Sequence, residues 1–163
     1  MRENSVMSDA SGPGVRVPPP LFFVGGWIAA WLLSRWKPLA IDGAGASGPQ
    51  VAVGTALVAA GLVLMGWALV TFRRARTPII PMFPARLVVD RGPFGLTRNP
   101  MYLGLTMGYV GLAAVLNQSW PIVLLPVVLI ALTKLVIARE EAHLTAAFGD
   151  EYRRYSARVR RWM

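Results

Sequence analysis

The stretch VAVGTALVAAGLVLMGWALVTF, residues 51–72, decides the fold class of this chain. It has 22 residues and no charged side chain, and an α-helix needs about 20 apolar residues to cross the hydrocarbon core of a bilayer. Arg73, Arg74 and Arg76 follow it at once, as is typical where a helix leaves the membrane. The stretch therefore predicts a membrane-spanning helix.

The composition of the whole chain agrees with a membrane protein. Of its 163 residues, 55% are hydrophobic and 15% charged, whereas a soluble domain has about 25% charged residues. The net charge of +9 raises the question of nucleic-acid binding, but outside the C-terminal tail no basic stretch is interleaved with aromatic residues. We expect the lipid bilayer, and no nucleic acid, as a partner. With no cysteine and one histidine, we expect no metal site.

Three further apolar segments complete the predicted bundle. The segment 21–37 is short for a crossing, and a signal peptide is its competing interpretation. A Pro-rich linker precedes it, where a signal peptide would have its charged region. Segments 101–116 and 120–138 are separated by only three polar residues and must form an antiparallel hairpin. We predict an all-α, polytopic membrane bundle of about four transmembrane helices.

The other segments differ in composition from these helices. Residues 1–20 are rich in Pro, Gly and small polar residues and are predicted to be a disordered tail, which leaves 21–163 as a single domain. The segment 77–100 contains five prolines and is predicted to be a loop, because proline interrupts helices. The glycine spacing within 43–48 is that of a dinucleotide-binding motif, but it lies between apolar segments and not between a strand and a helix, so we reject it.

The basic residues are distributed unevenly along the chain. Fourteen Lys and Arg residues lie in the N-terminal tail, the segment 73–98 and the C-terminal tail. Arg35 and Lys37 lie at the opposite end of the predicted bundle, and Lys134 lies within the last span. The positive-inside rule then predicts that both termini are cytoplasmic. We expect an integral protein of a bacterial inner membrane.

The C-terminal tail has a helical period. Its apolar stripe recurs every three or four residues, with four arginines off the stripe, and consists of Leu144, Phe148, Tyr152, Tyr155, Val159 and Trp162. This pattern predicts an amphipathic helix over 140–162 that lies in the membrane interface near anionic headgroups. A solvated helix packed on the cytoplasmic loop remains an alternative, and Gly149 can divide the helix in two.

Two polar clusters lie at the cytoplasmic side of the predicted hairpin. The first is GPFGLTRNPMYLG, residues 92–104, and the second is Arg139-Glu140-Glu141. A hairpin brings both to the same membrane depth, where they can line one pocket. Adjacent carboxylates at the end of a spanning helix are unfavourable without a cation. That cation is either an arginine of the protein, Arg98 or Arg139, or part of a bound ligand.

The stretch 87–104, the hydrophobic hairpin and the Glu140-Glu141 pair together resemble the isoprenylcysteine carboxyl methyltransferase family and its phospholipid methyltransferase relatives. Their pattern is Arg-His-Pro-x-Tyr-x-Gly, a hydrophobic stretch and Glu-Glu, and the resemblance spans residues 70–162. It implies an integral-membrane methyltransferase that binds S-adenosylmethionine at the cytoplasmic end of the bundle. The methyl acceptor would be a lipid-like or membrane-delivered small substrate. A noncatalytic scaffold or transporter-like bundle of the same fold is the alternative function.

The resemblance also implies which residues form the site. The cofactor-binding residues would be Val88, Val89, Gly92, Phe94, Arg98, Asn99, Pro100, Tyr102, Gly104, Glu140 and Glu141, and the catalytic residues Arg98, Asn99 and Tyr102. The Glu pair would bind the α-ammonium of the cofactor and Arg98 its carboxylate. Asn99 stands where the pattern has His and cannot titrate near neutral pH, which argues against an acid or base role there.

Three weaker signals have simpler explanations. Glu140 and His143 have the spacing of a di-iron ligand pair, but such sites need a second copy on another helix. Gly104 and Gly108 have the spacing that lets membrane helices approach closely, and packing within the bundle is favoured over dimerisation. Lys134 either lines a substrate portal or extends to the membrane surface.

Overall fold

The computed structural model describes residues 14–15, 17–76 and 87–163. Most of the predicted N-terminal tail and residues 77–86 of the predicted loop lie outside these residues. The described part of the chain is helical and contains no strand. Its elements are α1 (Pro20–Trp36), α2 (Gly48–Arg74), the 3-10 turn η1 (Gly92–Gly95), α3 (Pro100–Val115), α4 (Trp120–Leu132), the π-helix η2 (Thr133–Ile137), α5 (Ala138–Phe148) and α6 (Asp150–Arg158).

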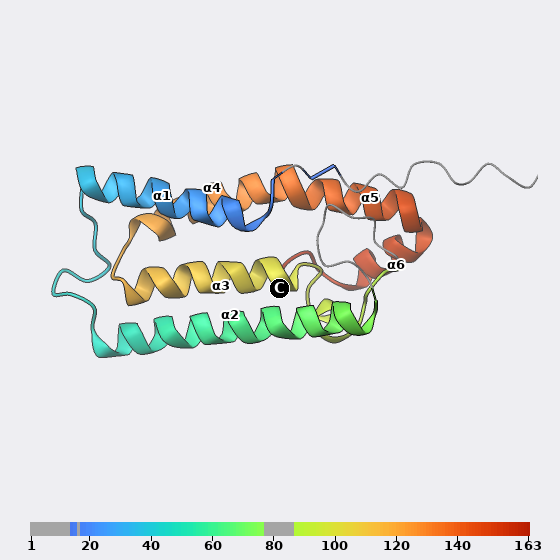
Figure 1. Ribbon diagram of the computed structural model, residues 1–163, viewed down its shortest axis with the longest axis horizontal. Helices are drawn as coiled ribbons and strands as arrows, with labels where there is room; N and C mark the ends of the chain where they lie inside the picture. The colour runs from blue at the N-terminus through green and yellow to red at the C-terminus, as the bar shows by residue number, and fades with distance from the viewer. Residues whose placement is uncertain (1–13, 16, 77–86) are drawn as a thin grey trace, which may run out of the picture.

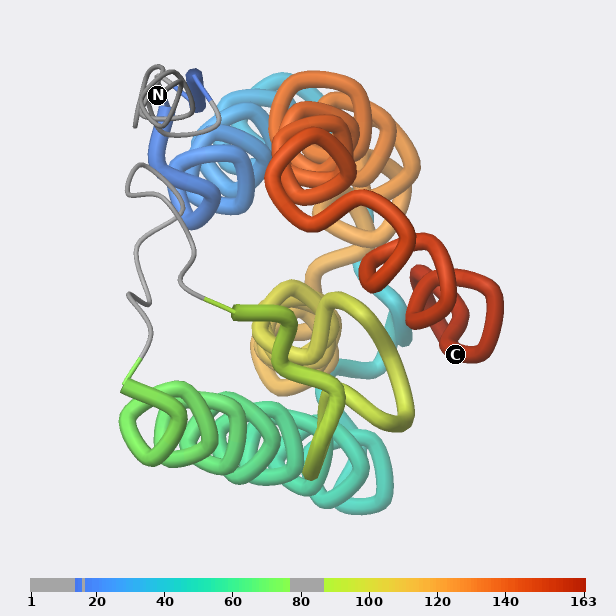
Figure 2. Tube along the Cα trace, turned by 90° about the vertical axis from the view of Figure 1, so that its right-hand side faces the viewer, coloured from blue at the N-terminus to red at the C-terminus, as the bar shows by residue number. Residues whose placement is uncertain are grey.

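The long helices run alternately up and down along one axis (Figure 1). α2 packs along α3, and α1 packs along α4. In the view along the axis, α3 lies between α2 on one side and the α1–α4 pair on the other (Figure 2). The start of α3, the end of α2, α5 and α6 therefore share one end of the bundle, which carries the predicted polar clusters.

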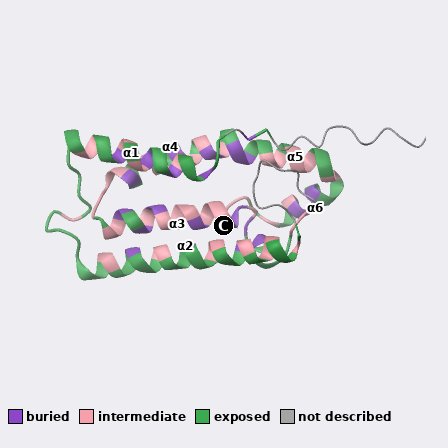
Figure 3. Cartoon of the chain, viewed as in Figure 1, coloured by how far each residue is buried: buried purple, intermediate pink, exposed green. Residues whose placement is uncertain are grey.

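Two of the helices among the described residues are long and apolar enough to cross a membrane. One is α2, with 27 residues, and the other is the continuous helix Trp120–Phe148, with 29 residues. α1 has 17 residues and α3 has 16. Exposed apolar side chains such as Ile28, Val63 and Val127 cover the outer faces of the bundle, where Figure 3 shows much of the helix surface exposed. Such a surface suits an apolar solvent.

The fourth predicted helix is longer than its apolar stretch. The sequence predicted a span ending at residue 138 and a separate helix over 140–162. The structure corrects both boundaries, because α4, η2 and α5 form one helix that ends at Phe148. Polar residues such as Arg and Glu sustain helical hydrogen bonding as well as apolar ones do, so loss of hydropathy does not end a helix. Gly149 ends it instead, with φ +51° and ψ −121°, a conformation that favours glycine.

The π-helix η2 changes which residues of the last long helix face the interior of the bundle. A π-turn holds one residue more than an α-helical turn, so the inward-facing stripe moves by one position along the chain. Val136 and Ile137 are neighbours, yet each is only 1% exposed. Beyond η2, Glu140 and Glu141 are half-buried, whereas Arg139 is exposed.

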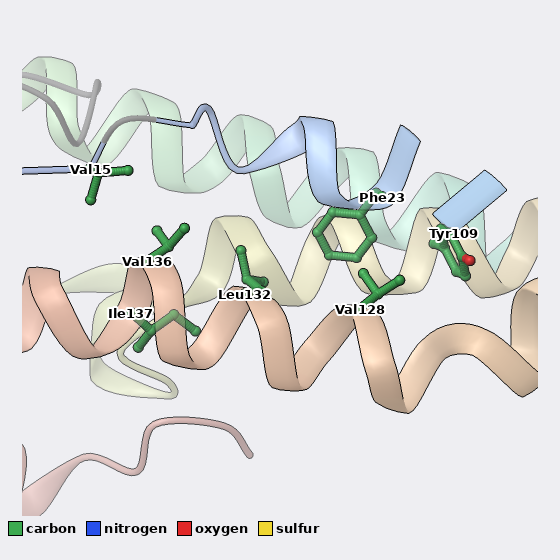
Figure 4. Close-up of a cluster of buried hydrophobic side chains, with 7 residues drawn as sticks. All are labelled: Val15, Phe23, Tyr109, Val128, Leu132, Val136 and Ile137. Atoms are coloured by element: carbon green, nitrogen blue, oxygen red, sulfur yellow. The ribbon is translucent and has the colours of Figure 1, made fainter. Parts of the chain in front are cut away.

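The core cluster lies between α1, α3 and the α4–η2 helix (Figure 4). Its buried members are Val15, Phe23, Tyr109, Val128, Leu132, Val136 and Ile137. Val15 is 5% exposed although the sequence places it in the predicted tail. The segment before α1 is thus fixed to the bundle at Val15, because an apolar side chain there fills space beside η2 (Figure 4).

Glycines bring α2 and α3 into close contact. A Cβ atom on Gly104 would lie 2.7 Å from the carbonyl oxygen of Gly61, and one on Gly111 would lie 2.5 Å from that of Gly54. A Cβ on Gly108 would meet nothing within 4 Å. Packing within the bundle is therefore confirmed for Gly104, but its partner along α3 is Gly111, two turns further on, and not Gly108.

Candidate functional site

Tyr102 and Glu140 join the two polar clusters predicted from the sequence. Tyr102 lies in the first turn of α3, and its hydroxyl donates a 2.6 Å hydrogen bond to Oε1 of Glu140 in α5. The two residues are 38 positions apart in the sequence. The hairpin and the π-turn together bring them into contact.

Glu141 has different partners from its neighbour. Arg161 donates to it through both Nε and Nη2, at 2.9 and 2.5 Å, which is the bidentate geometry of strong arginine–carboxylate pairs. Arg98 Nη1 lies 3.3 Å from the same carboxylate. Of the two arginines proposed as partners from the sequence, Arg98 is therefore confirmed. Arg139 instead donates to the carbonyl oxygen of Gly14, at 3.1 Å.

Arg161 is a site residue that the sequence reasoning missed. It lies after the end of α6, in the segment that returns to the start of α3, and the C-terminus lies over that region in Figure 1. The sequence offered only a weak signal, because Arg161 is one of several arginines off the predicted apolar stripe. Nothing in that pattern distinguishes it from the others.

Asn99 binds the same C-terminal segment. Its Nδ2 donates to the carbonyl oxygen of Arg161 at 3.0 Å, and Thr97 Oγ1 donates to that oxygen at 2.9 Å. The backbone N–H of Arg98 donates to the carbonyl oxygen of Arg160 at 2.9 Å. Asn99 is 8% exposed, and its side-chain amide is used within the protein. The segment 97–99 and the C-terminal segment thus form one unit.

The aromatic stripe of the tail packs on the protein. Tyr152 and Tyr155 are 4% and 5% exposed, and Trp162 packs against the core cluster. The prediction of one continuous helix over 140–162 is wrong, because the tail forms two helices, α5 and α6, and Tyr152 and Tyr155 of the predicted stripe pack on the protein, as in the alternative of a packed helix. The physical reason is that Gly149 turns α6 back toward η1.

The tyrosines of α6 hold both η1 and Arg98. Tyr155 Oη donates to the carbonyl oxygen of Phe94 at 2.8 Å, and Arg98 Nη1 donates to Tyr152 Oη at 3.4 Å. Burial raises the pKa of Tyr155, and burial together with the charge of Glu141 raises the pKa of Tyr152. Both hydroxyl groups therefore stay protonated at neutral pH.

The remaining predicted residues lie around this cluster. The ring of Phe94 is buried against Phe72, with centroids 4.5 Å apart, and Gly92 has φ +59°. Val88 and Val89 are half-buried in the segment before η1. Pro100 is buried at the first turn of α3, where its fixed φ suits a helix start. Gly104 packs on α2, as described above.

Two groups of the cluster have unused binding capacity. The Nε of Arg98 is buried and has no hydrogen-bond partner among the described residues. Glu140 has no ion pair among them either, since its recorded partner is the hydroxyl of Tyr102. An α-amino-acid zwitterion has a carboxylate and an ammonium group. The free donor on Arg98 suits the carboxylate, and the carboxylate of Glu140 suits the ammonium group. The part of the chain that the structure describes has no group of three His, Asp or Glu that could hold a metal.

An apolar groove of about 540 Å³ lies between α1 and α2, over α3. Its walls include Trp27 and Trp31 of α1 and Met65 of α2, and its floor includes Gly104 and Leu105. Gly108 widens it, because no side chain fills the space beside that residue. Leu105 is three positions from Tyr102, about one helical turn, so the groove begins near the polar cluster.

Comparison with known proteins identifies the family. No solved structure matches this chain. An uncharacterized protein of Haemophilus influenzae is 38% identical over 63 residues, which are 39% of this chain and 100% of that relative. The family model described as phospholipid methyltransferase matches residues 49–151, a range that includes all of α2 but its first residue and every predicted site residue. The chain therefore belongs to the phospholipid methyltransferase family.

Proposed function

We propose that the protein is an integral-membrane methyltransferase that uses S-adenosylmethionine and methylates a lipid-like or membrane-delivered small acceptor. Membership of a methyltransferase family gives the reaction class. The observation that carries the cofactor assignment is the pair of unused groups, Arg98 Nε and the Glu140 carboxylate, at the end of the bundle.

The charges of the cluster favour one orientation of the cofactor. Glu141 is neutralised by Arg98 and Arg161, so the α-ammonium group would bind Glu140 and not the Glu pair as a whole. The carboxylate would accept a hydrogen bond from Arg98. Tyr102 holds one oxygen of Glu140 through its 2.6 Å hydrogen bond and leaves the other oxygen for the ammonium. Asn99 has a positioning role, because its amide binds the carbonyl oxygen of Arg161.

The protein's contribution to the chemistry is positioning. When bound, S-adenosylmethionine would supply the methyl group of its sulfonium: the nucleophile of the acceptor would bond to the methyl carbon as the carbon–sulfur bond breaks, with S-adenosylhomocysteine as the leaving group. For a carboxylate acceptor the residues of the chain need only to orient both reactants and exclude water, whereas an amine acceptor would also need a general base. Phe94 and the half-buried Val88 and Val89 lie in the segment that would enclose the nucleoside.

The apolar groove supports the choice of acceptor. Its lining is made of aromatic, aliphatic and glycine residues, which favour a hydrocarbon chain over a polar ligand. Since Leu105 of its floor lies about one turn from Tyr102, an acceptor in the groove would place its polar head at the cluster. We therefore propose that the acceptor enters from the bilayer with its chain in this groove.

The proposed topology has four spans and both termini in the cytoplasm of a bacterium. α1 and α3 are about 25 Å long at 1.5 Å per residue, which is slightly less than the hydrocarbon core, and they run beside the two longer helices. Arg35 and Lys37 lie at one end of the bundle, whereas Arg73, Arg98 and Arg161 lie at the other. That asymmetry supports a cytoplasmic site, within one domain over 21–163.

Calorimetric titration of the protein in nanodiscs with S-adenosylmethionine tests the proposal. The parent should bind, and Glu140→Gln should bind about tenfold to a hundredfold more weakly, because a charged hydrogen bond contributes about 1.5–3 kcal/mol. Arg139→Gln is the control, since Arg139 is exposed and contacts Gly14. Absence of binding by the parent would favour the noncatalytic scaffold. Unchanged affinity in Glu140→Gln would remove that residue from the site.

A further inference from the structure

The C-terminal segment Arg160–Trp162 reaches the polar cluster from outside the four long helices. It follows Val159, whose backbone is extended, and it lies beyond the end of the family match at residue 151. Its contacts to the segment 97–99 include three hydrogen bonds of 3.0 Å or less. Trp162 anchors it by packing against the core cluster.

We propose that this segment completes the cofactor site and that Arg161 is its positioning residue, which gives Arg98 the free positive charge that binds the carboxylate of the cofactor. The inference rests on the proposed function. It assigns to Arg161 a role that neither the sequence pattern nor the family match assigns.

Arg161 changes the net charge around Arg98. Arg98 and Glu141 alone would form a neutral pair, with side chains 15% and 18% exposed. Such a pair has no net charge and attracts an anion only weakly, because the repulsion from Glu141 opposes the attraction to Arg98. Arg161 binds both oxygens of Glu141 through Nε and Nη2. The three side chains together then carry a net charge of +1, which suits a carboxylate ligand.

Arg161 also fixes the position of Arg98. The carbonyl oxygen of Arg161 accepts hydrogen bonds from Thr97 and Asn99, the residues on either side of Arg98. The side chain of Arg161 fixes Glu141, which in turn contacts Arg98 Nη1. Arg161 therefore restrains Arg98 through both the backbone and the side chain. The buried Nε of Arg98 has no hydrogen-bond partner among the described residues, so it is available to donate to a ligand.

The competing explanation is that Arg161 only stabilises the fold. The affinities for two ligands distinguish that explanation from a role in the site. S-adenosylhomocysteine and 5′-methylthioadenosine share the adenosine and the thioether sulfur, but only the first has the amino-acid end. Loss of a residue that acts through Arg98 should weaken the first ligand selectively. Loss of a residue that merely holds the fold should weaken both.

The experiment measures both affinities by calorimetry for the full-length protein in nanodiscs. Arg161→Gln should weaken S-adenosylhomocysteine about tenfold and leave 5′-methylthioadenosine within about twofold. Arg161→Lys, which keeps the charge, should recover most of the affinity even if the Gln variant folds poorly. Arg154→Gln is the matched control, because Arg154 is an exposed residue of α6 outside the segment Arg160–Trp162; it should leave the affinity for both ligands unchanged.

The possible outcomes separate this inference from the proposed function. Equal weakening of both ligands in Arg161→Gln, or unchanged affinity for both, overturns the role of Arg161 while the cofactor assignment stands. A Lys variant as weak as the Gln variant overturns the argument from charge. A parent protein that binds 5′-methylthioadenosine but not S-adenosylhomocysteine, or neither ligand, overturns the proposed function and this inference with it.

Discussion

The interface between α2 and α3 and the polar cluster around Glu141 position the same helix by opposite means. Along the interface, Gly54 and Gly61 of α2 meet Gly111 and Gly104 of α3 so closely that no Cβ atom fits. In the cluster, directed bonds from arginine, tyrosine and asparagine fix the residues at the start of α3. Close packing fixes the apolar part of α3, and charge and hydrogen bonding fix its polar end.

This difference predicts which changes each region tolerates. The glycine interface should be insensitive to salt and pH but intolerant of one added methyl group. The polar cluster should accept substitutions that conserve charge but not ones that remove it. Four substitutions test this contrast, in order of decreasing effect.

Gly111→Ala should have the largest effect. Its Cβ would lie 2.5 Å from the carbonyl oxygen of Gly54 and 2.9 Å from the backbone nitrogen of Val58, so the two helix backbones must separate. We expect a loss of about 3 kcal/mol, at the upper end of overpacking costs, seen as a lower melting temperature in detergent. Gly108→Ala, on the same helix with open space around its Cβ, should change little. Equal melting temperatures for the two variants would contradict the close-packed interface.

Gly149→Ala should loosen the polar cluster and leave the glycine interface intact. A residue other than glycine at φ +51° and ψ −121° costs about 1–3 kcal/mol. Hydrogen exchange should therefore increase in α6 and in the segment Val159–Trp162 but not in α2 or α3. Gly43→Ala, in an open loop, is the control. Faster exchange throughout the bundle would show that the two regions are not independent.

Tyr155→Phe should have a smaller effect that depends on pH. The change leaves the carbonyl oxygen of Phe94 without its 2.8 Å hydrogen bond, at a cost of about 1–2 kcal/mol. Burial raises the pKa of Tyr155 above its ordinary value of 10.0, so its contribution to stability is complete below pH 10.0 and decreases as the pH rises toward the raised pKa. Above pH 10.0, the melting temperature of the variant should thus decrease less steeply with rising pH than that of the parent. Identical slopes would argue against a buried neutral Tyr155.

Arg153→Ala should have the smallest effect of the four. Its ion pair with Asp150, at 2.9 Å, joins side chains that are 68% and 77% exposed. Solvent screens such pairs, so the expected change is less than about 0.5 kcal/mol. A melting temperature as low as that of Tyr155→Phe would mean that exposed charges contribute to α6 docking more than its buried contacts do.

The sequence alone determined the positions of the long helices. The predicted segments 21–37, 51–72 and 101–116 match α1, α2 and α3 within a few residues at each end, and the start of α4 was also predicted. This succeeds because apolar runs, prolines and polar breaks are local signals. The motif from Arg98 to Tyr102 and the Glu140-Glu141 pair likewise indicated the family, since residue identity and spacing are read directly from the chain.

Only the tertiary structure decided which side chains of the site contact one another. Glu140 and Glu141 are adjacent and chemically identical, yet one receives a hydrogen bond from Tyr102 and the other binds two arginines. The one-residue shift at η2 and the turn at Gly149 bring α5 and the C-terminal segment to the start of α3. A contact such as that of Arg161 with Glu141 depends on the rotation and direction of every helix and turn between the two residues. No local pattern in the sequence specifies these together.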